Sequence, residues 1–477
     1  MSNITTHITR TILLTCACLL LSVANVRAAS WTVTTTQDTN DAVCNADCSL
    51  RDAIYVAADG DIINFSALFN TPQVINFVYG TIYINHNVTI LGPGADVLTV
   101  SDAISPGVFS IPSGSTVTLS GMTVTNTANY SDTTIRNSGN LTILQCNLTE
   151  NFTSSAVTNY GTLSIHDSTI SENSGIYGGG IQNFGDLTLV NSTVSNNTAF
   201  GDLGGSESAG GIFSSGDTLT ITNSTISGNR KADSSNGGGI WTNSVTVITN
   251  STVTNNYASG VFSRGSSVTI RSSIVAANVG NSVQPDIVYG LGGGFISGGY
   301  NLIGNDGSGA FTNVGDQAGT GAAPLDPMLD PLSDYGGMTA THRLQGNSPA
   351  IDKGNSFGLT TDQRGFTRPF DKAHHRNAPG GDGSDIGAYE LQFAVAITGI
   401  VFDLSGIGLR NAWVLMRSAN GERRAVKTDR FGKYRFDNVA SNRIYQISPM
   451  HRVYEFTPQI VMVQEENISN LNFTALP

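Results

Sequence analysis

The chain has 477 residues, of which only 13% are charged, and its formal net charge is −12. This length is enough for two or three domains. The acidic balance argues against nucleic acid as a partner, and against polyanionic substrates such as pectate unless a metal intervenes. Val, Ile and Leu recur at short, regular intervals among the many Gly, Ser, Thr and Asn residues, a pattern that disordered chains lack.

Residues 1–29 have the pattern of a secretory signal peptide. Arg10 precedes the apolar run ILLTCACLLLSVA, and the small residues of VRAAS place cleavage near Ala28 or Ala29. A membrane anchor is the alternative, but it needs a longer apolar run. Cys16 and Cys18 leave a lipid-anchored variant open. We therefore expect a secreted, extracellular or cell-surface protein with no transmembrane segment after cleavage.

Three cysteines remain once the leader is removed: Cys44, Cys48 and Cys146. In an exported protein, Cys44 and Cys48 can close a small disulfide loop. Their spacing alone is weak evidence for zinc, because no second pair of ligands stands nearby.

Short phrases such as NSTVSNN, NSTISGN and NSTVTNN recur through the middle of the chain at steps of 22 to 32 residues. Apolar residues alternate with polar ones before each phrase, which predicts a strand with one buried face. No helical period lies between the strands, so the unit predicts an all-β, right-handed parallel β-helix. Each phrase ends in an asparagine that we expect to stack in a turn ladder: Asn151, Asn173, Asn197, Asn229, Asn256 and Asn278. Cys146 falls in the serine column of these phrases, which indicates a buried free thiol.

The segment CNADCSLRDAI, residues 44–54, resembles the CSLREA-type motif of exported β-helix proteins, with Asp52 where that family has Glu. The coil repeats are also similar to the GGxI and Ser/Thr-rich repeats of bacterial surface passenger domains. These resemblances imply a pectin-lyase-like solenoid. Open strand edges invite association, so the ends of the solenoid need cover. We assign this role to residues 44–54 and to the Q-like region described next.

Two further resemblances cover the C-terminal part of the chain. GGYNLIGN, LDPMLDPLSDYGGMTATHRLQGNSPAIDKGN, TDQRGFTRP and DIGAYE, between residues 298 and 390, together resemble the choice-of-anchor Q domain, an extracellular family that implies no catalytic activity. Strand patterns that include ITGIVFD, NAWVLM and TDRFGKYRFDNV resemble a carboxypeptidase regulatory-like domain. That family implies a small transthyretin-like or Ig-like β-sandwich without peptidase chemistry.

The expected domain boundaries follow from these patterns. They are 1–29 for the signal peptide, 30–310 for the β-helix with its cap, 311–393 for the Q-like C-terminal part of the β-helix, and 394–477 for the sandwich.

Three aromatic residues share one column of the repeat. Phe213, Trp241 and Phe262 each follow an inward-pointing anchor by one position. The pattern predicts that they point outward and stack on consecutive coils, where they suit sugar rings or a partner protein. The alternative is that the insertions cover them, or that they stack for stability.

Two pairs of acids align between coils, Glu150 with Glu172 and Asp186 with Asp217. Glycoside hydrolysis needs two carboxylates at a defined separation, but solvated turn acids are the favoured interpretation. His166 is expected on the surface. No nucleophile elbow, phosphate loop or His-rich metal cluster is apparent, so we assign no catalytic residue.

The Q-like region is rich in acids: Asp326, Asp330, Asp334, Asp352, Asp362 and Asp385. Arg343 and Arg364 offer partners for buried structural pairs. A Ca²⁺ site is the alternative, since oxygen ligands on loops suit that ion; otherwise no cofactor is expected. His374 and His375 adjoin acids as well, and we favour an exposed loop there over a metal site.

The sequence thus predicts a secreted or cell-surface, non-catalytic rod for adhesion or carbohydrate binding, with an extracellular glycan or surface protein as partner. The alternative is a polysaccharide lyase or glycoside hydrolase that acts on the β-helix face. The sequence leaves open whether the protein is an enzyme, and it favours a protein without catalytic activity.

Overall fold

The computed structural model describes residues 28–477 except for gaps at 103–106, 127–132, 153, 202–206, 233–236, 281–285, 373–374, 393, 419–422, 441–442 and 464–466. All but the last two residues of the expected signal peptide lie outside the described residues. Within the described part, no helix is long and apolar enough to cross a membrane.

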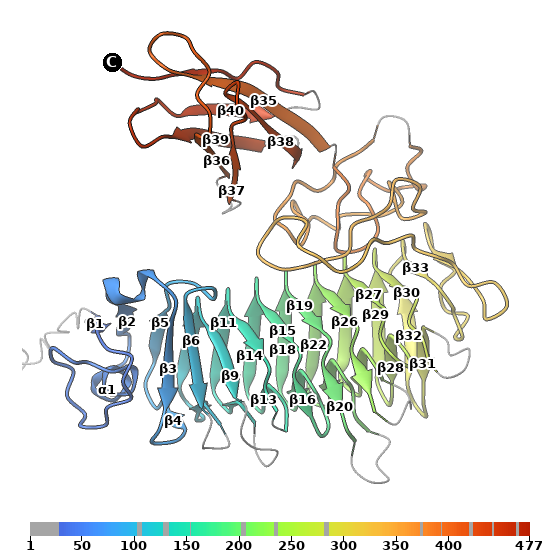
Figure 1. Ribbon diagram of the computed structural model, residues 1–477. Coiled ribbons are helices and arrows are strands. Elements are labelled where there is room, and N and C mark those ends of the chain that lie inside the picture. The colour runs from blue at the N-terminus through green and yellow to red at the C-terminus, as the bar shows by residue number, and fades with distance from the viewer. Residues whose placement is uncertain are drawn as a thin grey trace, which may run out of the picture.

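Three parallel sheets wind around one apolar core and form a β-solenoid (Figure 1). Sheet A contains β1 (Ser30–Val33), β2 (Ile62–Phe65), β5 (Val88–Leu91), β8 (Thr116–Ser120), β11 (Asn140–Leu144), β14 (Thr162–His166), β18 (Asp186–Val190), β22 (Thr218–Thr222), β26 (Val245–Thr249), β29 (Ser267–Arg271) and β32 (Gly294–Ser297). Sheet B contains β3 (Gln73–Phe77), β6 (Leu98–Asp102), β9 (Thr123–Asn126), β12 (Asn147–Thr149), β15 (Thr169–Ser171), β19 (Thr193–Ser195), β23 (Thr225–Ser227), β27 (Thr252–Thr254), β30 (Ile274–Ala276), β33 (Leu302–Ile303) and β34 (Gln317–Ala318). Sheet C contains β4 (Ile82–Tyr83), β7 (Phe109–Ile111), β10 (Ile135–Asn137), β13 (Val157–Asn159), β17 (Ile181–Asn183), β21 (Ile212–Ser214), β25 (Ile240–Thr242), β28 (Val261–Ser263) and β31 (Ile287–Tyr289). A short fourth sheet joins β16 (Ser174–Gly175), β20 (Thr198–Ala199) and β24 (Arg230–Lys231).

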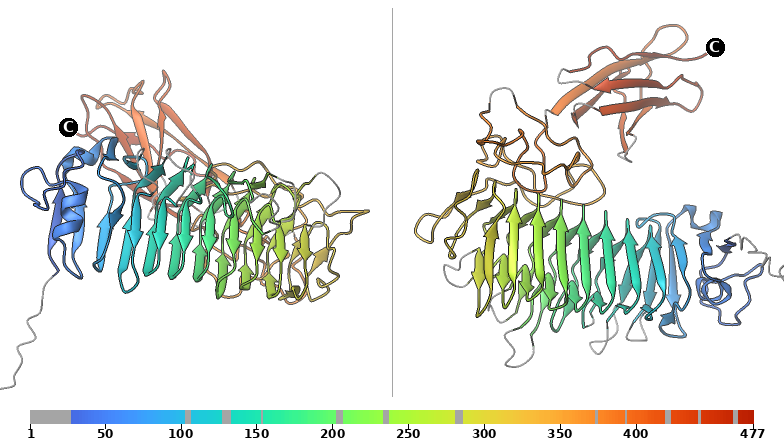
Figure 2. Two further views of the ribbon diagram at one scale, coloured as in Figure 1. Left: turned by 90° about the horizontal axis from the view of Figure 1, so that it is seen from below. Right: turned by 180° about the vertical axis from the view of Figure 1, so that it is seen from behind.

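The strand register explains why the sequence repeats. Leu163 pairs with Leu187, and Ile165 pairs with Leu189, so equivalent aliphatic residues lie above one another on successive coils. These side chains are fully buried, and they fill the interior of the solenoid. The predicted parallel β-helix is therefore confirmed, and so is the all-β class (Figure 2).

The six repeat asparagines lie buried in one column and form the Asn ladder. Each side-chain Nδ2 donates to Oδ1 of the next asparagine over 2.7–2.9 Å. The last amide, Asn278, donates to Oδ1 of Asp286 at 2.8 Å. Burial raises the pKa of Asp286, although it accepts these amide hydrogen bonds. A carboxylate at the end of the ladder supplies the acceptor that the next coil would otherwise provide.

A small helical cap covers the N-terminal coil. Helix α1 (Leu50–Val56) begins at Ser49, whose Oγ accepts from the backbone N of Asp52. Asp52 accepts in turn from Ser49 Oγ at 2.7 Å and from the backbone N of Ala42 at 3.0 Å. Burial opposes ionisation of Asp52, but these hydrogen bonds and one from Thr39 outweigh it and lower its pKa. A one-turn helix, η1 (Ala67–Asn70), follows β2.

Residues 319–392 fold back over the outer face of sheet B as an irregular layer, the back layer, seen above the coils in Figure 1. Only β34 extends the coil stack beyond residue 310, so most of the region expected as the C-terminal part of the β-helix does not form coils. Backbone pairing within the layer takes the form of isolated bridges such as Leu329 with Leu344. The layer packs on the solenoid where β30 presents Ile274 and Ala276 outward, and these join Leu344 and Ile351 in one apolar cluster.

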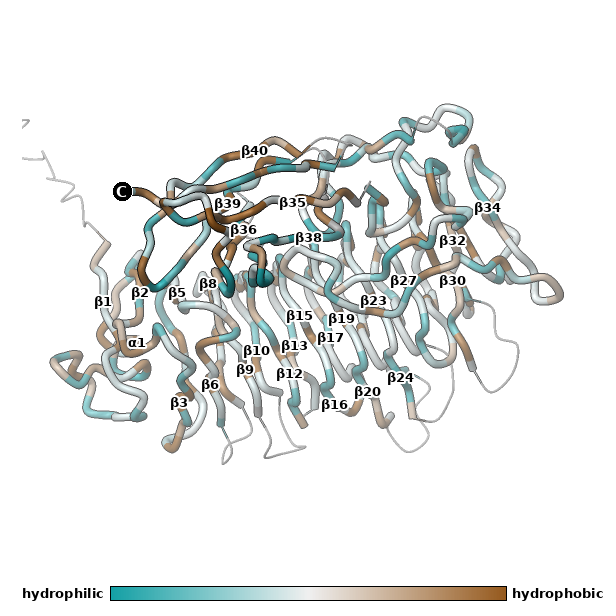
Figure 3. The backbone as a smooth tube through the Cα atoms, turned by 45° about the horizontal axis from the view of Figure 1, so that its top comes forward, coloured by the Kyte–Doolittle hydropathy of each residue, from teal (hydrophilic) through white to brown (hydrophobic). Residues whose placement is uncertain are grey.

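The C-terminal region is a β-sandwich of two sheets, as predicted. One sheet joins β38 (Lys433–Ala440), β35 (Ala394–Phe402) and β41 (Phe473–Thr474), and the other joins β37 (Arg423–Lys427), β36 (Trp413–Ser418), β39 (Arg443–Met450) and β40 (Gln459–Val463). Figure 3 shows the sandwich on the same side of the solenoid as the back layer. Arg443 joins the two: it donates to the carbonyl of Gly365 at 2.7 Å, and its guanidinium lies 3.4 Å from the Phe366 ring centroid.

Candidate functional site

The outer face of sheet B carries two columns of short polar side chains, the polar ladder. Thr169 pairs with Thr193 and Ser171 with Ser195, and the columns continue from coil to coil in the same register. Hydroxyl or amide groups occupy both columns from β6 to β27 at Thr99, Ser101, Thr123, Thr125, Asn147, Thr149, Thr169, Ser171, Thr193, Ser195, Thr225, Ser227, Thr252 and Thr254.

The back layer covers the C-terminal half of this ladder with uncharged polar contacts. Gln363 donates to Thr193 Oγ1 at 2.9 Å and accepts from Thr225 Oγ1 at 2.6 Å. Thr341 Oγ1 lies 2.9 Å from Thr225 Oγ1, and His342 Nε2 lies 2.9 Å from Ser227 Oγ. Burial lowers the pKa of His342, which favours its neutral ring. The covered hydroxyls of Thr193, Thr225 and Ser227 thus bind amide, hydroxyl and imidazole groups.

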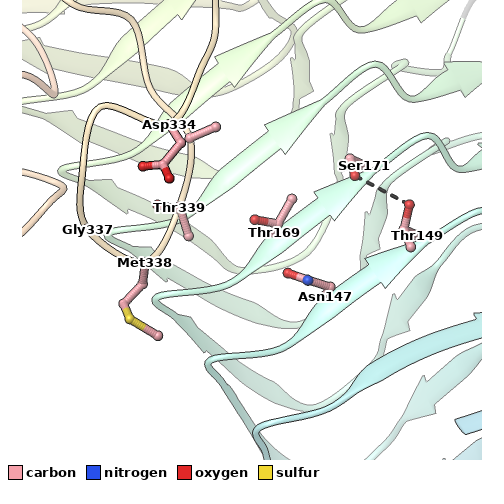
Figure 4. A pocket seen from close by; sticks show the side chains of 9 residues that line it. Asn147, Thr149, Thr169, Ser171, Asp334, Gly337, Met338 and Thr339 are labelled. Atoms are coloured by element: carbon pink, nitrogen blue, oxygen red, sulfur yellow. Dashed lines mark hydrogen bonds between the residues drawn. The ribbon is translucent and has the colours of Figure 1, made fainter. Parts of the chain in front are cut away.

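A groove opens where the ladder emerges from under the back layer (Figure 4). The cavity has a volume of about 330 Å³. Asn147, Thr149, Thr169 and Ser171 form its floor on β12 and β15. The back-layer loop that contains Asp334, Gly337, Met338, Thr339 and Ala340 forms its lip, as Figure 4 shows. Equivalent polar residues on β9 and β6 continue the floor toward the N-terminus, and they are half-buried.

The lining consists mainly of short, uncharged polar side chains. Asp334 is the one acid among the lining residues, and no lysine, arginine or histidine belongs to them. Hydrolysis of a glycosidic bond needs a second carboxylate across the bond. Met338 is half-exposed and adds an apolar surface to the lip.

The aromatic column corrects the prediction of an exposed binding surface and agrees with the alternative that the rings stack for stability. Phe213 and Trp241 are only 5% and 2% exposed, and Phe262 is half-buried. The rings do stack, with centroids 4.7 Å apart for Phe213 and Trp241 and 6.2 Å apart for Trp241 and Phe262. Ala209 belongs to the same cluster, and Phe184 meets Phe213 edge-on at 6.0 Å. These three residues therefore stabilise the rod and offer no open platform for a sugar.

Two neighbouring aromatic rings are exposed, but both already contact other side chains. Tyr160 and Phe184 stack with centroids 5.2 Å apart. The Arg136 guanidinium lies 4.9 Å from the Tyr160 ring centroid, and Phe213 contacts Phe184. Because the rings stack along the rod and have further neighbours at both ends of the pair, they are poorly placed to receive a sugar ring.

The acid pairs considered for catalysis do not form a site. Glu150 and Glu172 are exposed corner residues with left-handed backbones, φ 56° and 58°. Asp186 pairs in register with Thr218, and its carboxylate accepts from that hydroxyl at 2.6 Å. Asp217 lies one position before β22, so the predicted alignment of Asp186 with Asp217 is wrong by one residue. His166 is the last residue of β14 and is half-buried.

Several acids of the back layer form ion pairs. Asp362 binds Arg364 at 2.6 Å in a buried pair. Asp330 binds Arg343 at 2.6 Å, but this pair is partly exposed. A third pair, Glu390 with Arg368 at 2.8 Å, is fully buried and was missed at the sequence level. Asp326 and Asp334 are exposed.

Asp352 and Asp385 lie next to each other in the same layer. The backbone N of Asp352 donates to Asp385 Oδ1 at 2.8 Å. Burial raises the pKa of Asp385 to about 7, against hydrogen bonds from the backbone of Leu391 and Asp352 that lower it. No group of three or more acidic, His or Cys side chains within the described residues is arranged to hold a metal ion. Calcium binding therefore stays an untested prediction.

The remaining predicted residues are the three cysteines outside the expected signal peptide and the two adjacent histidines. Cys44 and Cys48 are joined by a disulfide beside α1. Cys146 is a buried free thiol, and burial raises its pKa to about 11. His375 is exposed, and His374 lies outside the described residues.

Sequence reasoning missed the polar ladder as a surface. Its signal was present in the repeat phrase, where Thr and Ser flank the core residue on both sides. A second amide column was missed as well: Asn137 donates to Asn159, and Asn159 donates to Asn183, each over 2.7 Å. Each of these residues stands two positions before a glycine, which is the readable sign of this corner.

Comparison with known proteins adds little to this geometry. No protein-family model matches the chain, and no curated protein matches it. One solved structure, described as "Crystal structure of pectate lyase Pel9A", resembles it with a TM-score of 0.39 and 13% identity, over 77% of this chain and 97% of that one. A likeness this weak carries no argument about function. The resemblances to the CSLREA-type, Q-type and regulatory-like families therefore stay expectations.

Proposed function

We propose that the protein is a secreted, non-catalytic binding protein whose groove on sheet B holds a segment of a neutral polysaccharide. One observation carries the proposal: the groove is lined by short hydroxyl and amide side chains, with one carboxylate and no cation. Sugar hydroxyls donate and accept hydrogen bonds, and Thr, Ser and Asn side chains do the same. Met338 supplies an apolar contact for the C–H face of a sugar ring.

The covered half of the ladder supports this ligand chemistry. There the same columns bind the amide of Gln363, the hydroxyl of Thr341 and the neutral ring of His342. In the open half the described contacts of these groups are local: Thr123 Oγ1 donates to the carbonyl of Ala95 at 2.6 Å, and Ser171 Oγ donates to Thr149 Oγ1 at 3.5 Å. The oxygens of these hydroxyls can still accept from a ligand. A neutral, hydroxyl-rich ligand satisfies such groups better than a charged one, because it brings no unpaired charge onto the sheet.

A polymer fits better than a single sugar. Successive coils are spaced by about 4.8 Å, so a chain that lies along the rod meets an equivalent pair of polar side chains at each coil. Floor residues repeat in this way from Thr169 on β15 to Thr123 on β9. The lip at Met338 and Thr339 then holds one end of the bound segment.

The alternative is a lyase or hydrolase that acts on the same face. Glu150 and Glu172 directly follow Thr149 and Ser171, so they are the nearest acids along the floor strands. Both are exposed, and neither is among the lining residues. Binding is favoured because both acids are solvated at the corner, outside the groove that the hydroxyl and amide groups line.

The test combines a glycan array with a reducing-sugar release assay on the full chain. The binding variant is Thr149→Val with Thr169→Val, which removes two hydroxyls from the floor at nearly constant shape. We expect it to weaken binding of the captured neutral glycan about tenfold, since each lost hydrogen bond contributes about 0.5–1.5 kcal/mol.

Thr142→Val is the matched control, because Thr142 points outward in the same way on sheet A. It should leave binding unchanged. Unchanged binding in the floor double variant would contradict the groove as the site. Sugar release that is lost in Glu150→Gln, Glu172→Gln or Asp334→Asn would establish the enzymatic alternative instead.

A further inference from the structure

The outer face of the four-stranded sandwich sheet carries cations and no acid. None of its strands, β37, β36, β39 and β40, contains an Asp or Glu. Val414 and Met416 of β36 point into the sandwich core, so alternate residues point outward. The outward side chains include Arg417 on β36, together with Arg423 and Lys427 on β37, and the two on β37 are exposed.

Two arginines of this face are placed directly opposite each other. Arg417 pairs with Arg423 on one side and with Gln446 on the other. Like charges directly opposite in a sheet are destabilising. Within the described residues neither arginine has a carboxylate partner. Edge strands use charge to prevent pairing, but β36 is an inner strand, so edge protection does not explain Arg417.

A second row of the same face joins a cation to an aromatic ring. Trp413 pairs with Lys427 and with Met450 across its two neighbouring strands. The Lys427 Nζ lies 4.5 Å from the centroid of the Trp413 ring, which is 46% exposed. An exposed indole beside a cation suits a sugar ring that carries an acidic group.

The sandwich and the rest of the chain after the expected signal peptide carry net charges of opposite sign. Residues 394–477 contain 10 basic and 7 acidic residues, a net +3, whereas residues 30–393 contain 12 and 29, a net −17. An anionic polymer is therefore repelled by the solenoid and the back layer and attracted only by the sandwich.

We propose that this face binds a linear acidic polysaccharide, whose anionic groups lie between Arg423 and Arg417 and next to Gln446. Neighbouring strands are about 4.8 Å apart, so a chain laid across β37, β36 and β39 meets Arg423, Arg417 and Gln446 in turn, and Ile460 follows on β40. The bound anion also removes the repulsion between the two arginines. A sheet of anionic lipid is the weaker candidate, because it extends beneath the acidic solenoid and repels it, whereas one polymer chain meets the sandwich alone.

The test measures binding of the full chain to immobilised polygalacturonate and dextran sulfate, with uncharged dextran as the blank. We expect Arg417→Gln with Arg423→Gln to reduce affinity for both polyanions at least tenfold. The control is Lys433→Gln with Arg435→Gln, which removes two charges from β38 of the other sheet. It should change affinity less than threefold. Added salt should weaken binding of the unmodified protein.

Three results would overturn the proposal. They are equal losses in the two double variants, no binding of either polyanion at low salt, and capture of vesicles of anionic lipid that depends on Arg417 and Arg423. The melting temperature separates these results from misfolding. Removing a repulsive pair should leave it unchanged or raise it, so a lower value would mean that the arginines stabilise the free sandwich. Floor variants of the groove should keep full polyanion binding, which makes this site independent of the proposed function.

Discussion

Asn229 shows how a single side chain supports the coil stack. Its Nδ2 donates to Asn256 Oδ1 and to the carbonyl of Val194, both at 2.9 Å. Its Oδ1 accepts from both the side chain and the backbone N of Asn197. These hydrogen bonds together hold the buried amide in one orientation.

Asn229→Ala should therefore lower stability without affecting ligand binding. The change leaves buried donors on Asn197 without an acceptor, which costs about 1–3 kcal/mol for each unsatisfied group. Urea unfolding, followed by circular dichroism, measures the loss. Asn140→Ala is the control, because Asn140 is exposed at the start of β11 and should change stability by less than about 0.5 kcal/mol. Equal effects of the two variants would argue against the ladder as a source of stability.

Asp385 gives the back layer a predicted dependence on pH. Burial raises its pKa to about 7, and burial with the nearby Asp385 carboxylate also raises the pKa of Glu390. Folding then favours the protonated form, so this contribution is complete below pH ~4 and is lost as pH rises toward 7. The melting temperature should fall between pH 5 and pH 8 in the native protein.

Asp385→Asn should reduce this slope, because the amide stays neutral throughout. Asp326→Asn is the matched control, since Asp326 is an exposed acid of the same layer. The prediction fails if the native protein and Asp385→Asn show the same pH profile.

At the scale of elements, the stacked rings of the aromatic column stabilise the solenoid. Trp241 is buried and stacked between Phe213 and Phe262. Trp241→Ala should destabilise the solenoid by about 3–5 kcal/mol, as large-to-small changes in packed sites do. Trp241→Phe should lose less, and both variants should keep full glycan binding while folded. Loss of glycan binding in Trp241→Phe with an unchanged melting temperature would restore the column as a binding site.

The strands and the Asn ladder could be predicted because the repeat is local. An apolar residue and an asparagine recur at a fixed offset, so alignment alone places Val194 with Ile226 and Asn197 with Asn229. The back layer could not be predicted in this way. Its contact from Gln363 to Thr193 spans 170 residues and belongs to no repeat.

The candidate site could not be predicted from the sequence for the same reason. Threonines such as Thr169 on the outer face look like generic strand residues, and their role depends on whether a distant loop covers them. The sequence left the burial of Phe213 as an alternative, because its neighbours, Ala209 and Phe184, belong to different columns of the repeat. Periodicity therefore predicts what lies inside the solenoid better than what lies on it.

At the scale of the whole molecule, the two proposed sites belong to parts of opposite charge. The groove is built by the solenoid and the back layer, and the face with Arg417 and Arg423 lies on the sandwich. The orientation of the sandwich decides whether one extended glycan network reaches both sites. Arg443 joins the sandwich to the back layer, through Gly365 and the ring of Phe366.

Arg443→Ala should release the sandwich without unfolding it. The guanidinium of Arg364 lies 4.0 Å from the same Phe366 ring centroid, so the ring is held on the back layer even when Arg443 is absent. Small-angle X-ray scattering should then show a larger radius of gyration and a broader distribution of distances, with the melting temperature nearly unchanged. Arg452→Ala, at an exposed arginine of the sandwich, is the control. An unchanged scattering curve would mean that other contacts fix the sandwich, and that the spacing of the two sites does not depend on Arg443.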